Sequence, residues 1–370
     1  MRNRPLTLAL LSVSALSSVL CLGACAPSYT AATTRAHSPR ADATPFTDYV
    51  AMGDSITAGV QSGGLTRDSQ RASYARLLGL RGGLEVGMPE VNDPGCPPPV
   101  TVRAAPNCTR RNPLLKTAVV AVPGAKVHDA LYSTDTAAQD PDPQLYDPRI
   151  YRLVLGPGTT QLAAALARRP RYVTLWIGNN DVLLPTLRGR PDQATSQDAF
   201  RRDYAALLDG LRAGGVERVV VMTVGNVTQV PALIPARLLR LRGLVDAGCQ
   251  GREVYFGSVV AARATAAAPL SCDAPEALTA EEYRQAQAVV DGYNATIREL
   301  AAARGLPVFD VNAVLAGLPG RPAIPSAQQP FGPSFSLDGV HPSSLAHQRF
   351  AQALAAFLNA QFGTDLDTRP

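Results

Sequence analysis

The chain has 370 residues, and 46% of them are hydrophobic, which is ordinary for a globular protein with a sizeable core and excludes a fibrous or wholly disordered chain. Its formal net charge is +5 and its sequence pI is near 9.0, yet only Lys116 and Lys126 are lysines. The other basic residues are arginines scattered without a long run, and no nucleic-acid-binding motif accompanies them. We therefore expect no nucleic-acid partner.

The first residues, 1–25, predict an export signal. Arg2 and Arg4 precede an apolar stretch that is too short and too early for a convincing membrane span. Leu22-Gly23-Ala24-Cys25 resembles a bacterial lipobox, in which Cys25 carries lipid and becomes the mature N-terminus. The alternative is plain secretion with cleavage after Ala26. We expect an exported protein that touches a membrane only through this anchor.

The composition after Cys25 divides the rest of the chain. Residues 26–45 are rich in Ala, Thr, Ser, Pro and Arg and predict a flexible tether. A folded domain is expected over residues 46–362, followed by a polar tail over residues 363–370.

Four cysteines lie within the expected domain, an even number that suggests two disulfides in an oxidising compartment. Sequence proximity favours Cys96 with Cys108 and Cys249 with Cys272. A zinc site is the rival interpretation, but the cysteines lack CxxC spacing and no histidine lies near them.

Short β-rich runs alternate with helical patterns along the domain. Strands are expected at residues 49–52, 117–122, 172–177, 218–224 and 307–311. Helices are expected at residues 161–167, 197–213, 280–303 and 343–361. This alternation predicts a mainly parallel sheet covered by helices on both faces, with the active site at the carboxyl ends of the strands.

Two regions are longer than such a scaffold needs, residues 90–113 and residues 234–279, and each contains one expected disulfide. Long ordered loops on a scaffold often carry specificity. In the second region Arg237, Arg240 and Arg242 alternate with leucines, which fits an amphipathic surface helix better than an interfacial lid.

The first chemical motif is Gly53-Asp54-Ser55-Ile56-Thr57, directly after the first expected strand. A serine at a strand-to-helix turn has a free hydroxyl and a backbone N–H where an oxyanion is stabilised. A structural helix N-cap is the alternative role for Ser55. The pattern does not match the G-x-S-x-G nucleophile elbow of α/β-hydrolases.

The second and third motifs follow the next two expected strands. Gly124 lets a backbone N–H approach a ligand closely, although taken alone it fits a simple Pro-Gly turn better. Gly178-Asn179-Asn180-Asp181 offers an asparagine amide, which is a good oxyanion donor. A turn stabilised by Asx hydrogen bonds is the alternative for this pair of asparagines.

The fourth motif is Asp338-Gly339-Val340-His341, just before the last expected helix. A histidine takes a proton from serine near neutral pH, and an aspartate three residues earlier can accept its Nδ1–H. The chain has only four histidines, which limits the choice. His37 lies in the tether, His128 is expected at a helix surface, and His347 lies inside the last helix.

Together the four motifs resemble those of the SGNH (GDSL-type) hydrolase family, whose signature residues are Ser, Gly, Asn and His. The resemblance implies a three-layer α/β/α sandwich with a mainly parallel five-stranded sheet. It also implies Ser55 as nucleophile, His341 as base, Asp338 as orienter, and Ser55, Gly124 and Asn180 as oxyanion donors. The second motif departs from the family, because Ala121-Val122-Pro123 replaces its usual asparagine.

We expect an exported serine esterase or lipase that hydrolyses a small-molecule or lipid carboxylic ester through an acyl-serine intermediate. A carbohydrate acetylesterase of the same fold and a non-catalytic surface-binding lipoprotein are the alternatives. No phosphate loop, nucleotide fingerprint or metal-ligand cluster occurs in the sequence, so we expect no cofactor and no metal. Trp176, on the third expected strand, is expected in the core.

Overall fold

The computed structural model describes residues 45–138, 146–320, 326 and 328–370. The predicted signal peptide with Cys25, and all of the predicted tether except Pro45, lie outside these described residues. All the helices and strands of the fold belong to the unit that contains residues 45–370.

A parallel sheet of four strands forms the centre of this unit, in the order β1-β2-β3-β7. Its strands are made largely of buried apolar residues, as expected for strands that are covered on both faces. The strands are β1 Tyr49–Gly53, β2 Tyr172–Trp176, β3 Arg218–Met222 and β7 Val308–Phe309.

The strand predicted at residues 117–122 is not observed as a strand. Within this segment only Val119 forms a bridge, which is parallel to Ala51 of β1. The segment still runs along β1, since Ala118 O accepts the Ala51 N–H at 2.9 Å and Val122 N–H donates to Gly53 O at 3.1 Å. Its other neighbour is a loop, as the Ala118 N–H donates to Gly87 O at 2.7 Å. The segment therefore lies at the edge of the sheet and is paired on one side. In the described chain the sheet has four strands, one fewer than the five predicted.

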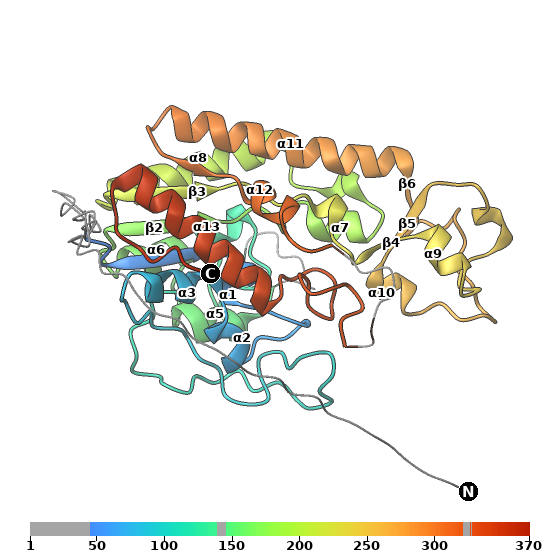
Figure 1. The fold of residues 1–370 in the computed structure, drawn as a ribbon, viewed down its shortest axis with the longest axis horizontal. Coiled ribbons are helices and arrows are strands. Elements are labelled where there is room, and N and C mark those ends of the chain that lie inside the picture. The colour runs from blue at the N-terminus through green and yellow to red at the C-terminus, as the bar shows by residue number, and fades with distance from the viewer. Residues whose placement is uncertain (1–44, 139–145, 321–325, 327) are drawn as a thin grey trace, which may run out of the picture. The chain divides into compact units, whose positions relative to one another are not determined.

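Helices cover both faces of the sheet, so the α/β/α architecture is as predicted (Figure 1). One group is α4 Val127–Tyr132, α6 Gln161–Leu166, α8 Gln197–Ala213 and α11 Ala280–Ala302. The other is α1 Ser55–Ala58, α2 Arg67–Arg71, α3 Tyr74–Arg81, α12 Val311–Ala316 and α13 Ser344–Phe362. The helices α5 Pro148–Leu155, α7 Leu183–Leu187 and α10 Ser258–Ala261 lie in the connections. The predicted helices correspond to α6, α8, α11 and α13.

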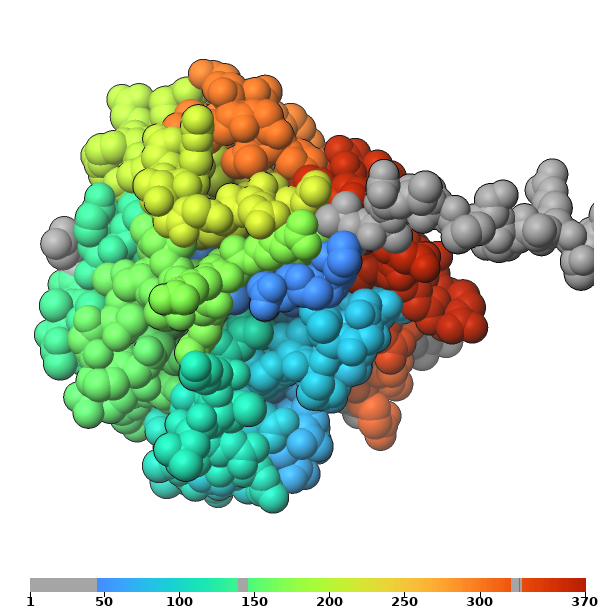
Figure 2. Space-filling model, turned by 90° about the vertical axis from the view of Figure 1, so that its left-hand side faces the viewer, coloured from blue at the N-terminus to red at the C-terminus, as the bar shows by residue number. Residues whose placement is uncertain are grey.

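Aromatic side chains close the amino-terminal end of the sheet. The rings of Phe46 and Tyr172 lie 5.0 Å apart, and Phe362 meets Tyr172 at 6.0 Å. Figure 2 shows this face, where the blue start of the described chain lies between green and light-blue segments and beside the red C-terminal segment. The tail is packed there, since Leu366 is buried and Arg81 donates to Asp367 O at 2.8 Å.

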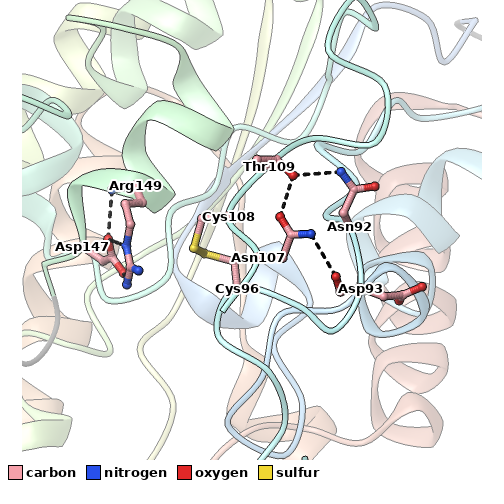
Figure 3. Close-up of a disulfide and its surroundings, with 8 residues drawn as sticks. All are labelled: Asn92, Asp93, Cys96, Asn107, Cys108, Thr109, Asp147 and Arg149. Carbon is pink, nitrogen blue, oxygen red and sulfur yellow. Dashed lines mark hydrogen bonds and ion pairs between the residues drawn. A yellow bond between two sulfur atoms is a disulfide. The ribbon is translucent and has the colours of Figure 1, made fainter. Parts of the chain in front are cut away.

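The two disulfides pair Cys96 with Cys108 and Cys249 with Cys272, as the sequence predicts. The first fixes the long loop over residues 90–113, where a hydrogen-bond network runs alongside it (Figure 3). Both are consistent with an extracellular protein. No helix in the described part of the chain is long and apolar enough to span a membrane.

The region between residues 234 and 279 is an antiparallel sheet and not only a loop, a feature the sequence did not indicate. Its strands are β4 Leu233–Pro235, β5 Val254–Gly257 and β6 Leu278–Thr279. The arginine-leucine stretch there forms the five-residue helix α9 Ala236–Arg240. A small apolar cluster around Phe256 and the second disulfide holds this sheet together.

Candidate active site

A strand end places Ser55 at the start of α1. The Asp54 carboxylate caps that helix by accepting the Ile56 N–H at 3.0 Å. Gln161 fixes the preceding turn, because its side chain accepts from Gly53 N–H and donates to Gly53 O. The capping role that the sequence allowed for Ser55 therefore belongs to its neighbour Asp54, and the Ser55 hydroxyl is left for other contacts.

Ser55, His341 and Asp338 form a continuous hydrogen-bonded chain. His341 Nε2 lies 2.9 Å from Ser55 Oγ, and His341 Nδ1 lies 2.8 Å from Asp338 Oδ2. Because an aspartate oxygen can only accept from the ring, Nδ1 carries a proton and Nε2 of the neutral imidazole is free to accept the serine O–H. This arrangement can move a proton away from the serine hydroxyl.

The turn around Asp338 holds its carboxylate in place. Oδ1 accepts the backbone N–H groups of Val340 at 2.8 Å and His341 at 2.9 Å, and the hydroxyl of Ser336 at 3.2 Å. Oδ2 also accepts the Gly63 N–H at 2.5 Å. These contacts fix the direction in which the carboxylate meets the imidazole, and no sequence pattern pointed to Ser336 or Gly63.

The pKa values of Asp338 and His341 are shifted in the directions that favour an ionised aspartate beside a protonated imidazole. Burial opposes ionisation of Asp338, but the facing His341 charge and the hydrogen bonds outweigh it, so the pKa of Asp338 lies below its usual range. Burial likewise opposes protonation of His341, but the Asp338 charge and hydrogen bond prevail and raise its pKa above the ordinary histidine value. The site therefore stabilises a proton on the imidazole.

Gly124 and Asn180 face the same cleft as Ser55 and His341. The cleft has a volume of about 350 Å³, and all four residues line it. Gly124 has a φ of 84°, the conformation that a Pro-Gly turn requires of its glycine, and the Ala125 N–H donates to Val122 O at 3.1 Å across that turn, so the turn is observed and it brings Gly124 to the cleft. Within the described residues, the backbone N–H groups of Ser55 and Gly124 make no hydrogen bond.

The two asparagines of the third motif have different surroundings. Asn180 Nδ2 donates to Ala125 O at 3.0 Å, which leaves a second amide hydrogen on the cleft side of the residue. Asn179 donates to Asp54 Oδ2 at 2.9 Å and accepts the Gly225 N–H at 3.0 Å, and it is not among the residues that line the cleft. Asn180 is therefore the asparagine placed to donate into the cleft, and Asn179 joins the serine turn to the loop after β3.

Asp54 and Asp181 are buried carboxyls beside the site. Burial raises the pKa of Asp54 to about 6, opposed by its bond from Asn179. Burial raises the pKa of Asp181 to about 7, opposed by its bond from the Val127 N–H at 3.0 Å. Through that bond Asp181 holds the start of α4, just after the Gly124 loop. Both residues lie within the sequence motifs, but the sequence assigned neither a role.

The other described histidines do not join the cleft. His128 Nδ1 lies 2.9 Å from Asp203 Oδ2 on the side of α4. His347 is fully buried in α13 and accepts the Tyr74 N–H at 3.2 Å, and burial lowers its pKa to about 3. Within the described chain, no three His, Cys, Asp or Glu side chains come together as a group that could hold a metal.

Long loops form the wall of the cleft opposite α7. Pro97, next to Cys96, lines it together with Gly63 and Asp147. The Leu65 N–H donates to Pro97 O at 3.0 Å and so ties this loop to the segment after α1. Figure 3 shows Asp147 and its partner Arg149 beside the disulfide. One residue of the loop over residues 90–113, Pro97, thus lies in the wall of the cleft.

Comparisons with known proteins place the chain in a family. The model for the GDSL-like lipase/acylhydrolase family matches residues 49–354. Among solved structures, the chain is similar to a lipase/acylhydrolase from Enterococcus faecalis, with 14% identity, 87% of this chain and 98% of that chain covered, and a TM-score of 0.40. It is also similar to an acetyl xylan esterase from Geobacillus stearothermophilus, with 15% identity, coverages of 87% and 96%, and a TM-score of 0.39. A comparison with curated protein sequences finds no significant match. The family model spans the serine, glycine, asparagine and histidine motifs, and the chain belongs to the GDSL-like lipase/acylhydrolase family.

Proposed function

We propose that this chain is an exported serine esterase or lipase that hydrolyses carboxylic esters through an acyl-serine intermediate. The observation that carries the proposal is the hydrogen-bonded chain from Ser55 Oγ through His341 to Asp338 at the cleft. Family membership and the two disulfides are consistent with it. The substrate is a small-molecule or lipid ester, and no cofactor takes part.

In the first half of the reaction, His341 Nε2 takes the proton of Ser55 as Oγ attacks the ester carbonyl carbon. The backbone N–H groups of Ser55 and Gly124 and the Asn180 amide stabilise the negative oxygen of the tetrahedral intermediate. The bond to the alcohol oxygen then breaks, and His341 gives that oxygen its proton. Asp338 keeps the imidazole oriented and stabilises its charged form.

In the second half, a water molecule takes the place of the alcohol. His341 removes its proton as the oxygen attacks the acyl-serine carbonyl, and the same three donors stabilise the second oxyanion. The carboxylic acid leaves as Ser55 recovers its proton from His341. The raised pKa of His341 fits this double role, because the ring must hold a proton between the two steps of each half.

The test is an assay of a protein that begins after Ala26, against p-nitrophenyl esters from acetate to palmitate. We expect hydrolysis by the wild type and a loss of about 10³-fold or more in Ser55→Ala. Ser344→Ala, which removes an exposed hydroxyl from the start of α13, serves as the matched control and keeps full activity. Hydrolysis that survives Ser55→Ala would refute the nucleophile.

The assay also separates the alternative functions. Activity on acetate alone, together with release of acetate from an acetylated sugar, would favour a carbohydrate acetylesterase. Folded protein that cleaves none of these esters would favour a binding role.

We propose further that Cys25 carries the lipid that anchors the exported enzyme. Metabolic labelling with a radioactive fatty acid tests this in cells that express the full chain. Label should enter the wild type and be lost in Cys25→Ser. An unlabelled protein found in the medium would instead indicate plain secretion.

A further inference from the structure

A second and smaller pocket lies beside the catalytic cleft. Its volume is about 140 Å³, and most of its lining is apolar, including Trp176, Val227, Val230, Leu315 and Phe335. Leu183 and Val340 line both this pocket and the catalytic cleft, so the two meet at these side chains. The carboxyl end of β2, the segment that follows β3 and the helix α12 contribute to it, none of which carries the nucleophile.

Two of the polar side chains around this pocket already have protein partners, while the buried Nε1 of Trp176 has none in the described part of the chain. Asn179 uses both ends of its amide, on Asp54 and on Gly225. Asn226 Oδ1 accepts from Gln287 Nε2 at 3.3 Å. An occupant therefore finds few hydrogen-bond partners and gains mainly by removing apolar surface from water. The pocket favours a hydrocarbon group.

The size of the pocket limits that group. An engineered apolar protein cavity of about 150 Å³ stays dry and binds benzene, a molecule of six carbons. A pocket of about 140 Å³ has similar room for an alkyl chain of about that many carbons. Longer chains have to extend out of it at an unfavourable cost.

The chemistry of the reaction decides which part of the ester enters the pocket. The three oxyanion donors line the wide cleft, and so does His341, which must protonate the leaving alcohol oxygen. Three of the four substituents on the tetrahedral carbon, namely Ser55 Oγ, the oxyanion and the alcohol oxygen, are therefore directed to the wide cleft. The remaining substituent is the acyl chain, and Ile56, the residue directly after the nucleophile, lines the small pocket.

We propose that the small pocket binds the acyl chain of the substrate and sets a preference for linear acyl groups of about six carbons. The alcohol part of the ester then occupies the wider cleft. This inference rests on the proposed esterase function and names the substrate class of the same site.

Gly225 offers a direct way to fill the pocket. A Cβ atom built there would lie 3.6 Å from Asn179 Oδ1 and 3.7 Å from Leu315 Cδ1, which are ordinary contacts with two lining residues. Gly225 is not among the glycines with positive φ, so a larger residue fits its backbone. Gly317 is the matched control, since it is exposed and its Cβ would lie 3.6 Å from Val314 O, outside the pocket.

Trp176 supplies a readout that does not depend on catalysis. It is the only tryptophan in the chain, it is buried, and it lines the small pocket. A ligand that enters the pocket changes the surroundings of the indole ring and therefore its fluorescence. Titration of the wild type with hexanoate should give a saturable change, and acetate should give little. Gly225→Leu should abolish the response and Gly317→Leu should keep it.

The kinetic test uses esters with the chain on either side of the carbonyl. Gly225→Leu should lower kcat/KM for ethyl hexanoate about tenfold or more and leave ethyl acetate and hexyl acetate nearly unchanged. Gly317→Leu should change none of them. Leu315→Ala, which enlarges the pocket, should move the acyl optimum to longer chains, and it replaces Gly225→Leu if that variant does not fold.

The outcomes separate this inference from the proposed function. A loss confined to hexyl acetate would assign the pocket to the alcohol and overturn the inference, as would equal losses on all three esters. A wild type that hydrolyses no ester would defeat the proposed function. In that case a saturable response of Trp176 to hexanoate would still support an alkyl-binding pocket, and its absence would overturn it.

Discussion

The side-chain amide of Asn180 donates to the carbonyl oxygen of Ala125 at 3.0 Å, and so joins two of the proposed oxyanion donors, since Ala125 directly follows Gly124. One amide hydrogen therefore positions the glycine loop while the other is left for the substrate oxygen. A second bond reinforces this link, because Asp181, next to Asn180, accepts at 3.0 Å the N–H of Val127, two residues after Ala125.

Replacing Asn180 tests the oxyanion donor. Asn180→Ala removes the amide and should lower kcat by about 10²- to 10³-fold, because the donor acts mainly on charge that develops in the transition state. Steady-state kinetics on the best p-nitrophenyl ester measure this. A rise in KM at constant kcat would contradict the assignment. Asn112→Ala, which removes an exposed asparagine amide that lines neither pocket, is the control and should leave kcat on the same ester nearly unchanged.

Asp338→Asn tests the base and its orienter through the pH profile. Activity needs neutral His341, whose pKa is raised by Asp338, so kcat/KM of the wild type should reach half its maximum above pH 6.5. The variant should lower kcat by about 10³- to 10⁴-fold and shift the half-maximum to lower pH. An unshifted profile would show that Asp338 does not act on the imidazole. Asp310→Asn, at a half-exposed ion pair with Arg298, serves as the control.

Asp181→Asn tests how far the buried carboxylate of Asp181 lowers the free energy of unfolding when it is ionised. Its pKa is raised to about 7 in the folded state from an ordinary value of 3.8. The folded protein is stabilised relative to the unfolded chain by the protonated form of Asp181. This stabilisation is fully present below pH 3.8 and is lost as the pH rises through 7. The neutral variant should therefore gain stability relative to the wild type between pH 4.5 and pH 8, by a few kcal/mol on the order expected for such a shift.

Thermal unfolding at the two pH values measures this difference. Asp209→Asn is the contrasting variant, because hydrogen bonding to Arg304 lowers the pKa of this exposed carboxyl. Its effect should be small and of the opposite sign. Equal Tm differences at both pH values for Asp181→Asn would mean that Asp181 does not titrate in this range.

The disulfides should differ in their effect on catalysis. Replacing Cys96 and Cys108 by serine frees the loop that carries Pro97 at the cleft wall, so KM should rise and stability should fall by about 2–5 kcal/mol. The same change at Cys249 and Cys272 should cost stability in the small sheet and leave KM for acetate esters unchanged. Denaturant unfolding and steady-state kinetics test both pairs. Equal KM values in the two double variants would contradict the role of the first loop.

The sequence by itself determined the elements that are local or periodic. Hydrophobic runs located the four strands, amphipathic patterns located α8, α11 and α13, and short motifs located Ser55, Asn180 and His341. The Asp338–His341 contact was predictable because its partners are three residues apart in one turn. Disulfide pairing followed from the short separations between the cysteines.

Tertiary structure alone decided the features that join distant segments. The short segment along β1 remained outside the sheet ladder because its outer side meets a loop, which no local pattern reveals. Gly63 and Gln161 reach the site from far along the chain, and a backbone N–H or a lone glutamine carries no signal in sequence. The small pocket likewise exists only where side chains from β2, the segment after β3 and α12 meet, because an empty volume is set by packing between elements and not by any one of them.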